Sequence, residues 1–208
     1  MLHILTDFLK PAKRRKGRIN NAEKCIEHRF NRKGCGGDGG GVLCSAFSKT
    51  LARAGAKVAL LDLNYDAAKQ YADEITAEGG IAKAYKCNVL DKAACYEVAD
   101  EVEKDFGKCD ILVNGAGGNN PKCTTVHEEY ENGDEQASDF LTFFNIDEKG
   151  FDFVFDLNIK GVLLPSQVFM ADMIGRKGCS VLNISSMNAY RPLTKIPAYS
   201  AAKAAVCF

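Results

Sequence analysis

Two residues near the end of the 208-residue chain have the types and spacing of a proton-transfer pair. Tyr199 and Lys203 lie four residues apart in a helix-favouring, Ala-rich stretch, so a helix would place them on one face. An ammonium group close to a phenol favours the phenolate, and we therefore expect Lys203 to lower the pKa of Tyr199 from its reference value of about 10. The spacing alone is more often that of a surface pair on a helix.

A third residue supplies the context for this pair. Ser186 precedes Tyr199 by thirteen residues and ends an apolar run, residues 181–186, that predicts a strand. From the end of this strand its hydroxyl can hydrogen-bond the same substrate oxygen as the phenol. The three side chains together would protonate or deprotonate an alcohol.

Regular elements that could position these residues begin at about residue 40, where β-prone runs alternate with helical stretches. This alternation predicts a parallel sheet wound with helices. The expected strands are residues 57–62, 81–89, 109–114 and 179–184, and the expected helices are 43–54, 66–78, 91–106 and 148–174, the last kinked at Pro165. Residues 119–147 lack periodicity and are acidic, which predicts a long surface excursion with no more than one short helix. Loops of this length are usually functional or disordered.

An acidic residue ends the first of these strands. Asp62 follows the glycine run Gly39-Gly-Gly41 by some twenty residues. In a dinucleotide-binding fold an acid at this place accepts hydrogen bonds from the adenosine ribose and repels a 2′-phosphate, so NAD(H) is preferred over NADP(H). The alternative is that Asp62 is only a helix N-cap.

The strand ending at Ser186, the loop after it and the Tyr199/Lys203 pair resemble the catalytic segment of the short-chain dehydrogenase/reductase family. Two further elements carry the resemblance. Asn114-Gly115-Ala116-Gly117 is similar to the family's Asn-Asn-Ala-Gly element, with Gly115 in place of the second Asn. Asn158 is similar to the asparagine that the family has in a helix. The resemblance covers roughly residues 39–208 and is strongest in the ordered set Asn114, Asn158, Ser186, Tyr199 and Lys203.

The resemblance implies a three-layer, Rossmann-type α/β fold and an NAD(H)-dependent alcohol/ketone oxidoreductase. It implies that Tyr199 exchanges a proton with the substrate oxygen, that residues 114–117 let the backbone approach the cofactor, and that Asn88 faces the adenine where the family usually has Asp. It also implies that the backbone carbonyl of Asn158 helps to hold a water in a proton relay to Lys203. Alone, an asparagine in the middle of a helix is more often merely tolerated.

The substrate is the least determined part of the prediction. Residues 117–121, the acidic excursion and the Phe-rich residues 151–155 together are similar to the sugar-acid branch of the family, the fructuronate reductases (D-mannonate oxidoreductases). The guanidinium of Arg191 would suit a sugar carboxylate, because it binds carboxylates bidentately, and Asn119 and Asn120 could meet sugar hydroxyls. A solvated loop charge is an equal alternative for Arg191.

Composition excludes several other classes. The formal net charge of zero gives no reason to expect a nucleic-acid partner, and no stretch approaches the roughly 20 apolar residues of a membrane span. The nine cysteines are scattered and never in Cys-x-x-Cys spacing, which predicts neither a disulfide framework nor a metal site and favours a reducing cytoplasm. The resemblance adds that full-length relatives are commonly homo-oligomers built on the helices 91–106 and 148–174.

The two ends of the chain depart from the family's pattern. Residues 1–38 form an atypical segment with ten Lys/Arg between residues 10 and 33, and no apolar first strand can be identified directly before the glycine run. Such a basic run is also typical of nucleic-acid or targeting tails. Back-translation of residues 27–38 with freely chosen codons, shifted by one base, yields Asn-Ile-Asp-Leu-Thr-Gly-Lys-Val-Ala-Val-Val, so we hypothesise that the segment is translated out of frame.

At the other end, Phe208 comes five residues after Lys203, whereas the family continues with further strands. We therefore expect residues 39–208 to form a partial dinucleotide-binding domain without the C-terminal strands, with weak or no activity and poor solubility. The alternative function is a non-catalytic nucleotide-binding fragment of the same fold.

Overall fold

The computed structural model describes residues 24–29 and 39–207 of the chain. Five parallel strands form one sheet in the order β3-β2-β1-β4-β5. The strands are β1 (Lys24–Arg29), β2 (Lys57–Asp62), β3 (Ile81–Lys86), β4 (Ile111–Asn114) and β5 (Ser180–Asn183). This order is that of a doubly wound sheet, and the three-layer α/β fold predicted from the sequence is confirmed.

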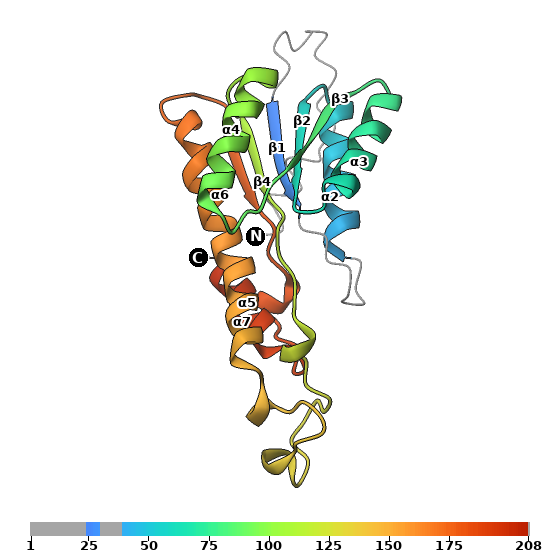
Figure 1. Cartoon of the computed structure of the whole chain (residues 1–208), viewed down its shortest axis with the longest axis vertical. Coiled ribbons are helices and arrows are strands. Elements are labelled where there is room, and N and C mark those ends of the chain that lie inside the picture. Colours follow the sequence, from blue (N-terminus) through green and yellow to red (C-terminus); the bar gives the residue numbers. More distant parts are fainter. Residues whose placement is uncertain (1–23, 30–38, 208) are drawn as a thin grey trace.

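Helices cover both faces of the sheet (Figure 1). α2 (Gly39–Arg53) and α3 (Tyr65–Ala77) lie on one face, and α4 (Lys92–Phe106) with α6 (Gly161–Phe169) lies on the other. Residues of β2 alternate between the two layers: Val58 and Leu60 pack with α2 and α3, whereas Ala59 and Leu61 pack with α4 and α6. A strand buried on both faces explains the continuous apolar run of residues 58–61 within β2.

The first strand corrects one expectation. β1 lies between β2 and β4, in the place where a first strand was predicted to be missing or unreadable. Its residues come before the polar stretch in which no strand could be identified. Ladder hydrogen bonds are made by the backbone, so pairing with two neighbours does not require the apolar pattern on which the sequence argument relied. Residues 30–38 and the rest of the basic segment lie outside the described residues.

A long helical segment follows the excursion. It consists of α5 (Glu148–Phe155), the π-helical turn η4 (Asp156–Lys160), α6 and the 3₁₀ turn η5 (Met170–Met173). The break in α-helical register falls at η4, while Pro165, the predicted kink, lies inside α6. By length and composition alone, Glu148–Met173 would suffice to cross a membrane, which the sequence argument did not anticipate. It packs, however, against the sheet, against α4 and against α7 (Pro197–Ala205).

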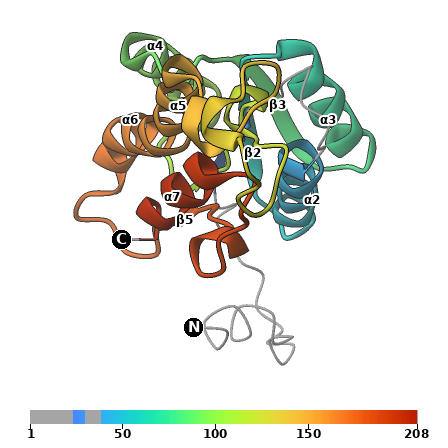
Figure 2. The same cartoon turned by 90° about the horizontal axis from the view of Figure 1, so that it is seen from below.

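The segment 119–147 is folded and projects beyond the sheet at the lower end of the molecule (Figure 1). It contains three short 3₁₀ helices, η1 (Pro121–Cys123), η2 (Asp134–Gln136) and η3 (Phe143–Asn145), more than the single short helix allowed by the sequence argument. Seen from below, it lies beside α5 and α7 (Figure 2). We call residues 119–147 the excursion. Its backbone joins the segment before α7 through a hydrogen bond from Thr125 N to Lys195 O, 2.9 Å.

Candidate active site

The predicted site residues lie at the carboxyl edge of the sheet, where the strand order reverses between β1 and β4. Asp62 ends β2, Asn114 ends β4, and Ser186 follows β5. Open parallel sheets bind their ligands in the crevice at this edge, beside the switch point. The topology therefore brings together residues that are far apart in the sequence.

The Ser186 hydroxyl lies beside the Tyr199 phenol, and hydrogen bonding from it favours the phenolate. Ser186 begins a short 3₁₀ turn, in which its hydroxyl accepts from Asn188 N at 3.2 Å, and Tyr199 lies in the first turns of α7. Burial raises the pKa of the Tyr199 phenol, and the bond to Ser186 offsets this only partly. The predicted lowering of this pKa by Lys203 is therefore wrong for the chain alone.

The position of Lys203 explains that correction. Its ammonium lies 5.8 Å from the centre of the Tyr199 ring and donates to the carbonyl of Ile184 at 2.8 Å. Lys203 is only 3% exposed, and this burial lowers its pKa from 10.5 to about 8. The two residues share a face of α7 as predicted, but desolvation dominates the titration of both.

Asn158 holds the loop after β4 against the π-helical turn. The side chain is fully buried, donates to Gly118 O at 2.8 Å and to Val154 O at 2.7 Å, and accepts from Gly118 N at 3.2 Å. π-helical turns are frequent at functional sites. The structure thus gives Asn158 a role for its side chain, as the anchor of the glycine loop, in addition to the carbonyl role that the resemblance implies.

Gly117 lies where no side chain fits. A Cβ built on it would lie 2.7 Å from both Asn158 Oδ1 and Lys203 Nζ, closer than real contacts allow. The glycine therefore lets Asn158 and Lys203 approach the same stretch of backbone. Gly115 is half-buried and Ala116 is buried beside it.

Asn114 belongs to a polar network that the sequence argument missed in part. Its amide nitrogen donates to Ser166 Oγ at 2.9 Å and to Asn183 Oδ1 at 2.8 Å, linking β4 to α6 and β5. Asn183 is paired with Asn114 in the sheet register. A signal for Asn183 was present in the sequence, since it is a polar residue in the apolar run before Ser186 and lies at the end of its strand as Asn114 does. Ser166 offered no comparable signal.

The residues predicted to bind the adenosine end lie apart from the catalytic group. Asp62 is buried at the end of β2 and its Oδ1 accepts from Asn64 N at 2.8 Å. The N-cap of α3 is Asn64, so the alternative role of Asp62 as the helix N-cap is not the one observed. Asn88 is exposed after β3, with its Oδ1 accepting from Leu90 N at 3.1 Å. The glycine run 39–41 forms the first turn of α2.

The residues predicted to bind substrate lie in two loops, Asn119 and Asn120 after β4 and Arg191 after Ser186. Asn119 donates to Thr124 Oγ1 at 2.8 Å, and Asn120 caps η1 by accepting from Lys122 N at 3.1 Å. Both amides therefore bond within the loop. Arg191 is exposed in the loop after Ser186, so its guanidinium can reach a ligand from solvent.

The arrangement fits a dinucleotide. A buried acid ends β2, a helix begins with three glycines beyond β1, and a backbone loop after β4 is kept free of side chains at Gly117. Helix N-termini favour phosphate groups, and the buried acid suits ribose hydroxyls. Lys203, Tyr199 and Ser186 would then lie at the nicotinamide end of the bound cofactor. Among the described residues, no group of His, Cys, Asp or Glu side chains could hold a metal ion.

Comparisons with known proteins agree with this geometry. A family model described as short chain dehydrogenase matches residues 36–208. An uncharacterised oxidoreductase of Haemophilus influenzae is 56% identical over 167 residues, which cover 80% of this chain and 58% of the relative. UxuB, an uncharacterised oxidoreductase of Bacillus subtilis, is 45% identical over 168 residues, covering 81% of this chain and 59% of the relative. The chain thus spans less than two thirds of the length of these relatives.

A solved structure gives the same result. It has a TM-score of 0.79 and 52% sequence identity, and covers 88% of this chain and 62% of the other. The protein is from Haemophilus influenzae, contains bound NAD, and carries the provisional name D-mannonate oxidoreductase.

Proposed function

Because this chain belongs to the short-chain dehydrogenase/reductase family, we propose that the protein transfers a hydride between NAD(H) and a sugar-acid ketone or alcohol of the fructuronate/mannonate type. The observation that carries the proposal is the placement of Ser186 and Tyr199 next to each other, beside the buried Lys203. A hydroxyl, a phenol and an ammonium group are the groups needed to transfer a proton to or from the substrate oxygen.

The chain's residues have separate tasks in ketone reduction. Ser186 and Tyr199 both hydrogen-bond the substrate oxygen, and the Tyr199 phenol gives it a proton. A raised pKa keeps Tyr199 protonated at neutral pH, so the phenol is ready as a donor. When bound, NADH supplies the hydride that the carbonyl carbon accepts. Lys203 stabilises the phenolate left behind, and oxidation of the alcohol reverses each step.

We further propose that Asp62 makes NAD(H) the preferred cofactor. Its buried carboxylate would lie against a 2′-phosphate, which costs free energy because both groups are negatively charged. The bound NAD in the Haemophilus structure supports this choice, although it is an observation on that protein.

The sugar-acid substrate is proposed from two considerations. One is the provisional name of the Haemophilus protein, and the other is the exposed guanidinium of Arg191 in the loop between Ser186 and Tyr199. A bidentate bond to a carboxylate would hold the substrate within reach of the phenol. A neutral ketone would form no ion pair with this guanidinium.

Steady-state NADH oxidation tests the proposal. Fructuronate reduction in this assay, even if weak, should depend on NADH and be at least about 100-fold less efficient with NADPH, and Tyr199→Phe should lower the parent's kcat by about 10²–10⁴. The matched control is Tyr190→Phe, an exposed tyrosine in the same loop region, which should keep full activity. Reduction of a neutral ketone but not of fructuronate would refute the substrate. Tight NADH binding with no turnover of either would instead indicate the non-catalytic nucleotide-binding alternative.

A further inference from the structure

The excursion contains a cavity that the proposed reaction does not use. It has a volume of about 420 Å³ and is lined by residues of the excursion together with Thr194. This volume lies in the range of small-molecule sites, roughly 300–1,000 Å³. Tyr130, Phe143 and Phe144 are among its lining residues, so aromatic rings form part of its wall.

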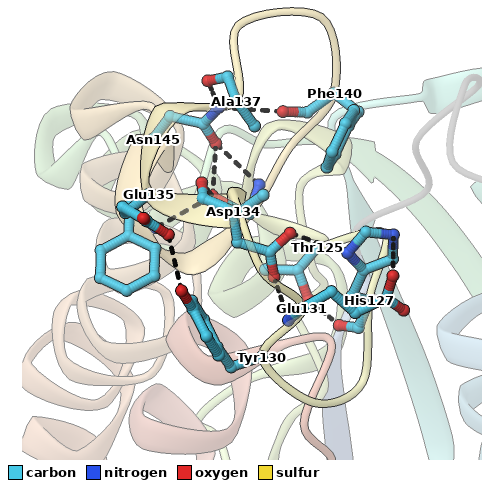
Figure 3. Close-up of polar contacts among 11 residues, drawn as sticks. Thr125, His127, Tyr130, Glu131, Asp134, Glu135, Ala137, Phe140 and Asn145 are labelled. Atoms are coloured by element: carbon cyan, nitrogen blue, oxygen red, sulfur yellow. Dashed lines mark hydrogen bonds and ion pairs between the residues drawn. The ribbon is translucent and has the colours of Figure 1, made fainter.

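The walls of this cavity are held by hydrogen bonds within the excursion (Figure 3). Asp134 is the centre of this network: its carboxylate bonds His127 Nδ1 at 2.9 Å and Glu131 N at 3.0 Å, and its carbonyl accepts from Thr142 Oγ1 at 2.9 Å. Backbone donation from Glu131 and the contact with His127 lower the pKa of Asp134. The cavity is therefore preformed, which reduces the entropy cost of binding a ligand.

The aromatic rings stand nearly at right angles to one another. Tyr130 and Phe144 have ring centres 6.3 Å apart and an interplanar angle of 79°, and Phe143 and Phe144 have centres 5.8 Å apart at 86°. Tyr130 is also fixed by its hydroxyl, which donates to Glu135 at 2.9 Å. A sugar ring stacks on one broad aromatic face, whereas perpendicular faces suit a compact, rounded group. The electron-rich faces of such rings attract cations.

The charges around the cavity have one dominant sign. The excursion carries seven Asp/Glu and a single Lys, and Glu128 and Glu129 line the cavity itself. Lys195 pairs with one of these acids, its Nζ lying 4.0 Å from Glu128 Oε1, but this exposed pair has little strength. An anionic ligand such as a sugar acid would be repelled here, and a cation would be attracted.

We propose that the aromatic pocket of the excursion binds a small organic cation with a methylated ammonium head group. The three ring faces would surround the head group while Glu129 supplies a carboxylate at the rim. The site is separate from the catalytic group in its residues and in the charge of its ligand. Its existence does not depend on the proposed oxidoreductase activity, because it is defined by binding alone.

Calorimetric titration of this chain with choline tests the proposal. The neutral isostere 3,3-dimethyl-1-butanol has the same shape without the charge, and choline should bind about tenfold more tightly. Phe144→Leu should weaken choline binding about tenfold while leaving the circular dichroism spectrum unchanged, and Glu129→Gln should weaken it several-fold.

The matched controls are Tyr96→Leu and Glu97→Gln on α4, an exposed aromatic and an exposed acid outside the pocket, which should bind choline as the parent does. Equal affinity for choline and the neutral alcohol would overturn the proposal, as would preferential binding of glucose or mannonate. If Phe144→Leu fails to fold, Glu129→Gln decides, since it removes charge from an exposed position without altering the packing. Unchanged choline affinity in that variant would then count against the site.

Discussion

The catalytic group and the excursion are built on opposite principles. The hydrogen bonds that position the catalytic group join residues distant in the sequence, 40 positions apart for Gly118 and Asn158 and 69 for Asn114 and Asn183. Those of the excursion join residues 7 positions apart for His127 and Asp134 and 8 for Thr142 and Asp134. The hydrogen bonds of the catalytic group need the assembled sheet, whereas these hydrogen bonds of the excursion join residues within the excursion.

The two regions also differ in what surrounds their polar atoms. Asn114 and Asn158 are fully buried in the domain, whereas the excursion buries Asp134 and Thr142 beneath exposed side chains such as Phe143, which is 70% exposed. A perturbation of the catalytic group should therefore be transmitted to the whole domain, because its polar atoms are surrounded by core. A perturbation of the excursion should remain local. Three pairs of variants test this comparison.

The largest effect is expected from a pair of asparagines that make the same number of side-chain hydrogen bonds to the backbone. Asn158 bonds Gly118 twice and Val154 once, and Asn145 in the excursion bonds Thr142 N, Ala137 O and Phe140 O. Asn158→Ala should lower the free energy of unfolding by about 3 kcal/mol, roughly 1 kcal/mol for each bond lost. It should also lower kcat/KM for NADH oxidation about 100-fold, because the loop at Gly117 loses its anchor.

The matched variant is Asn145→Ala. It should accelerate amide hydrogen exchange in residues 125–145 and leave NADH affinity and global urea unfolding nearly unchanged. A similar global destabilisation by both variants would mean that the excursion is part of the cooperative core, and the comparison between the two regions would fail.

The catalytic group was predictable because it lies on regular elements. Lys57–Asp62 forms β2 as predicted, and Asp91 caps α4 by accepting from Ala93 N and Ala94 N. Once such elements are placed, parallel topology requires the residues at their carboxyl ends to meet. Spacing of four residues likewise sufficed to put Tyr199 and Lys203 on one face of α7.

What could not be predicted depends on the surroundings of each residue. The pKa of Tyr199 rises because the phenol is buried, and burial is a property of the assembled fold. The turns of the excursion depend on single side-chain bonds, such as Asn145 to Thr142, which leave no periodic pattern in the sequence. The partners of Asn114 on α6 required the packing of that helix.

The hypothesis about the start of the chain concerns the gene and not the fold. The family model begins to match at residue 36, after β1, and the translation of residues 1–38 out of frame stays a prediction. The nucleotide sequence of the gene tests it. Codons that fail to encode an apolar strand after a one-base shift would end the idea.

The second prediction concerns the buried ammonium of Lys203. Its pKa is about 8 in the folded chain and 10.5 ordinarily, so between these pH values the unfolded chain binds the proton that the folded chain has released. The cost of burying the charge is complete below pH 8 and is relieved as pH rises through this window. The free energy of unfolding should therefore rise by about 3 kcal/mol relative to Lys203→Met, measured by urea unfolding at pH 7.5 to 10.5.

Lys69 is paired with Asp73 on the exposed face of α3. Its effect on the free energy of unfolding should change with pH in the opposite direction. Its pKa is raised by that hydrogen bond, so its contribution to stability is present at neutral pH and is lost as pH rises through the alkaline range. Comparison with Lys69→Met should show no alkaline gain. A pH-independent difference between the parent and Lys203→Met would show that Lys203 is not buried as a charge.

The third prediction contrasts two neighbouring glycines at the junction of the two regions. A Cβ at Gly117 would lie 2.7 Å from Lys203 Nζ and from Asn158 Oδ1, whereas at Gly118 the nearest atom, Leu157 Cδ2, is 3.9 Å away. Gly117→Ala should displace the ammonium, cost about 1–3 kcal/mol of unfolding free energy, and weaken NADH binding about tenfold. Gly118→Ala should change NADH affinity less than about twofold, since 3.9 Å is an ordinary contact. NADH fluorescence titration measures both affinities. Equal losses of NADH affinity in the two variants would contradict the prediction. They would mean that general stiffness of the loop governs the cofactor site, and not the approach of Lys203 and Asn158 to residue 117.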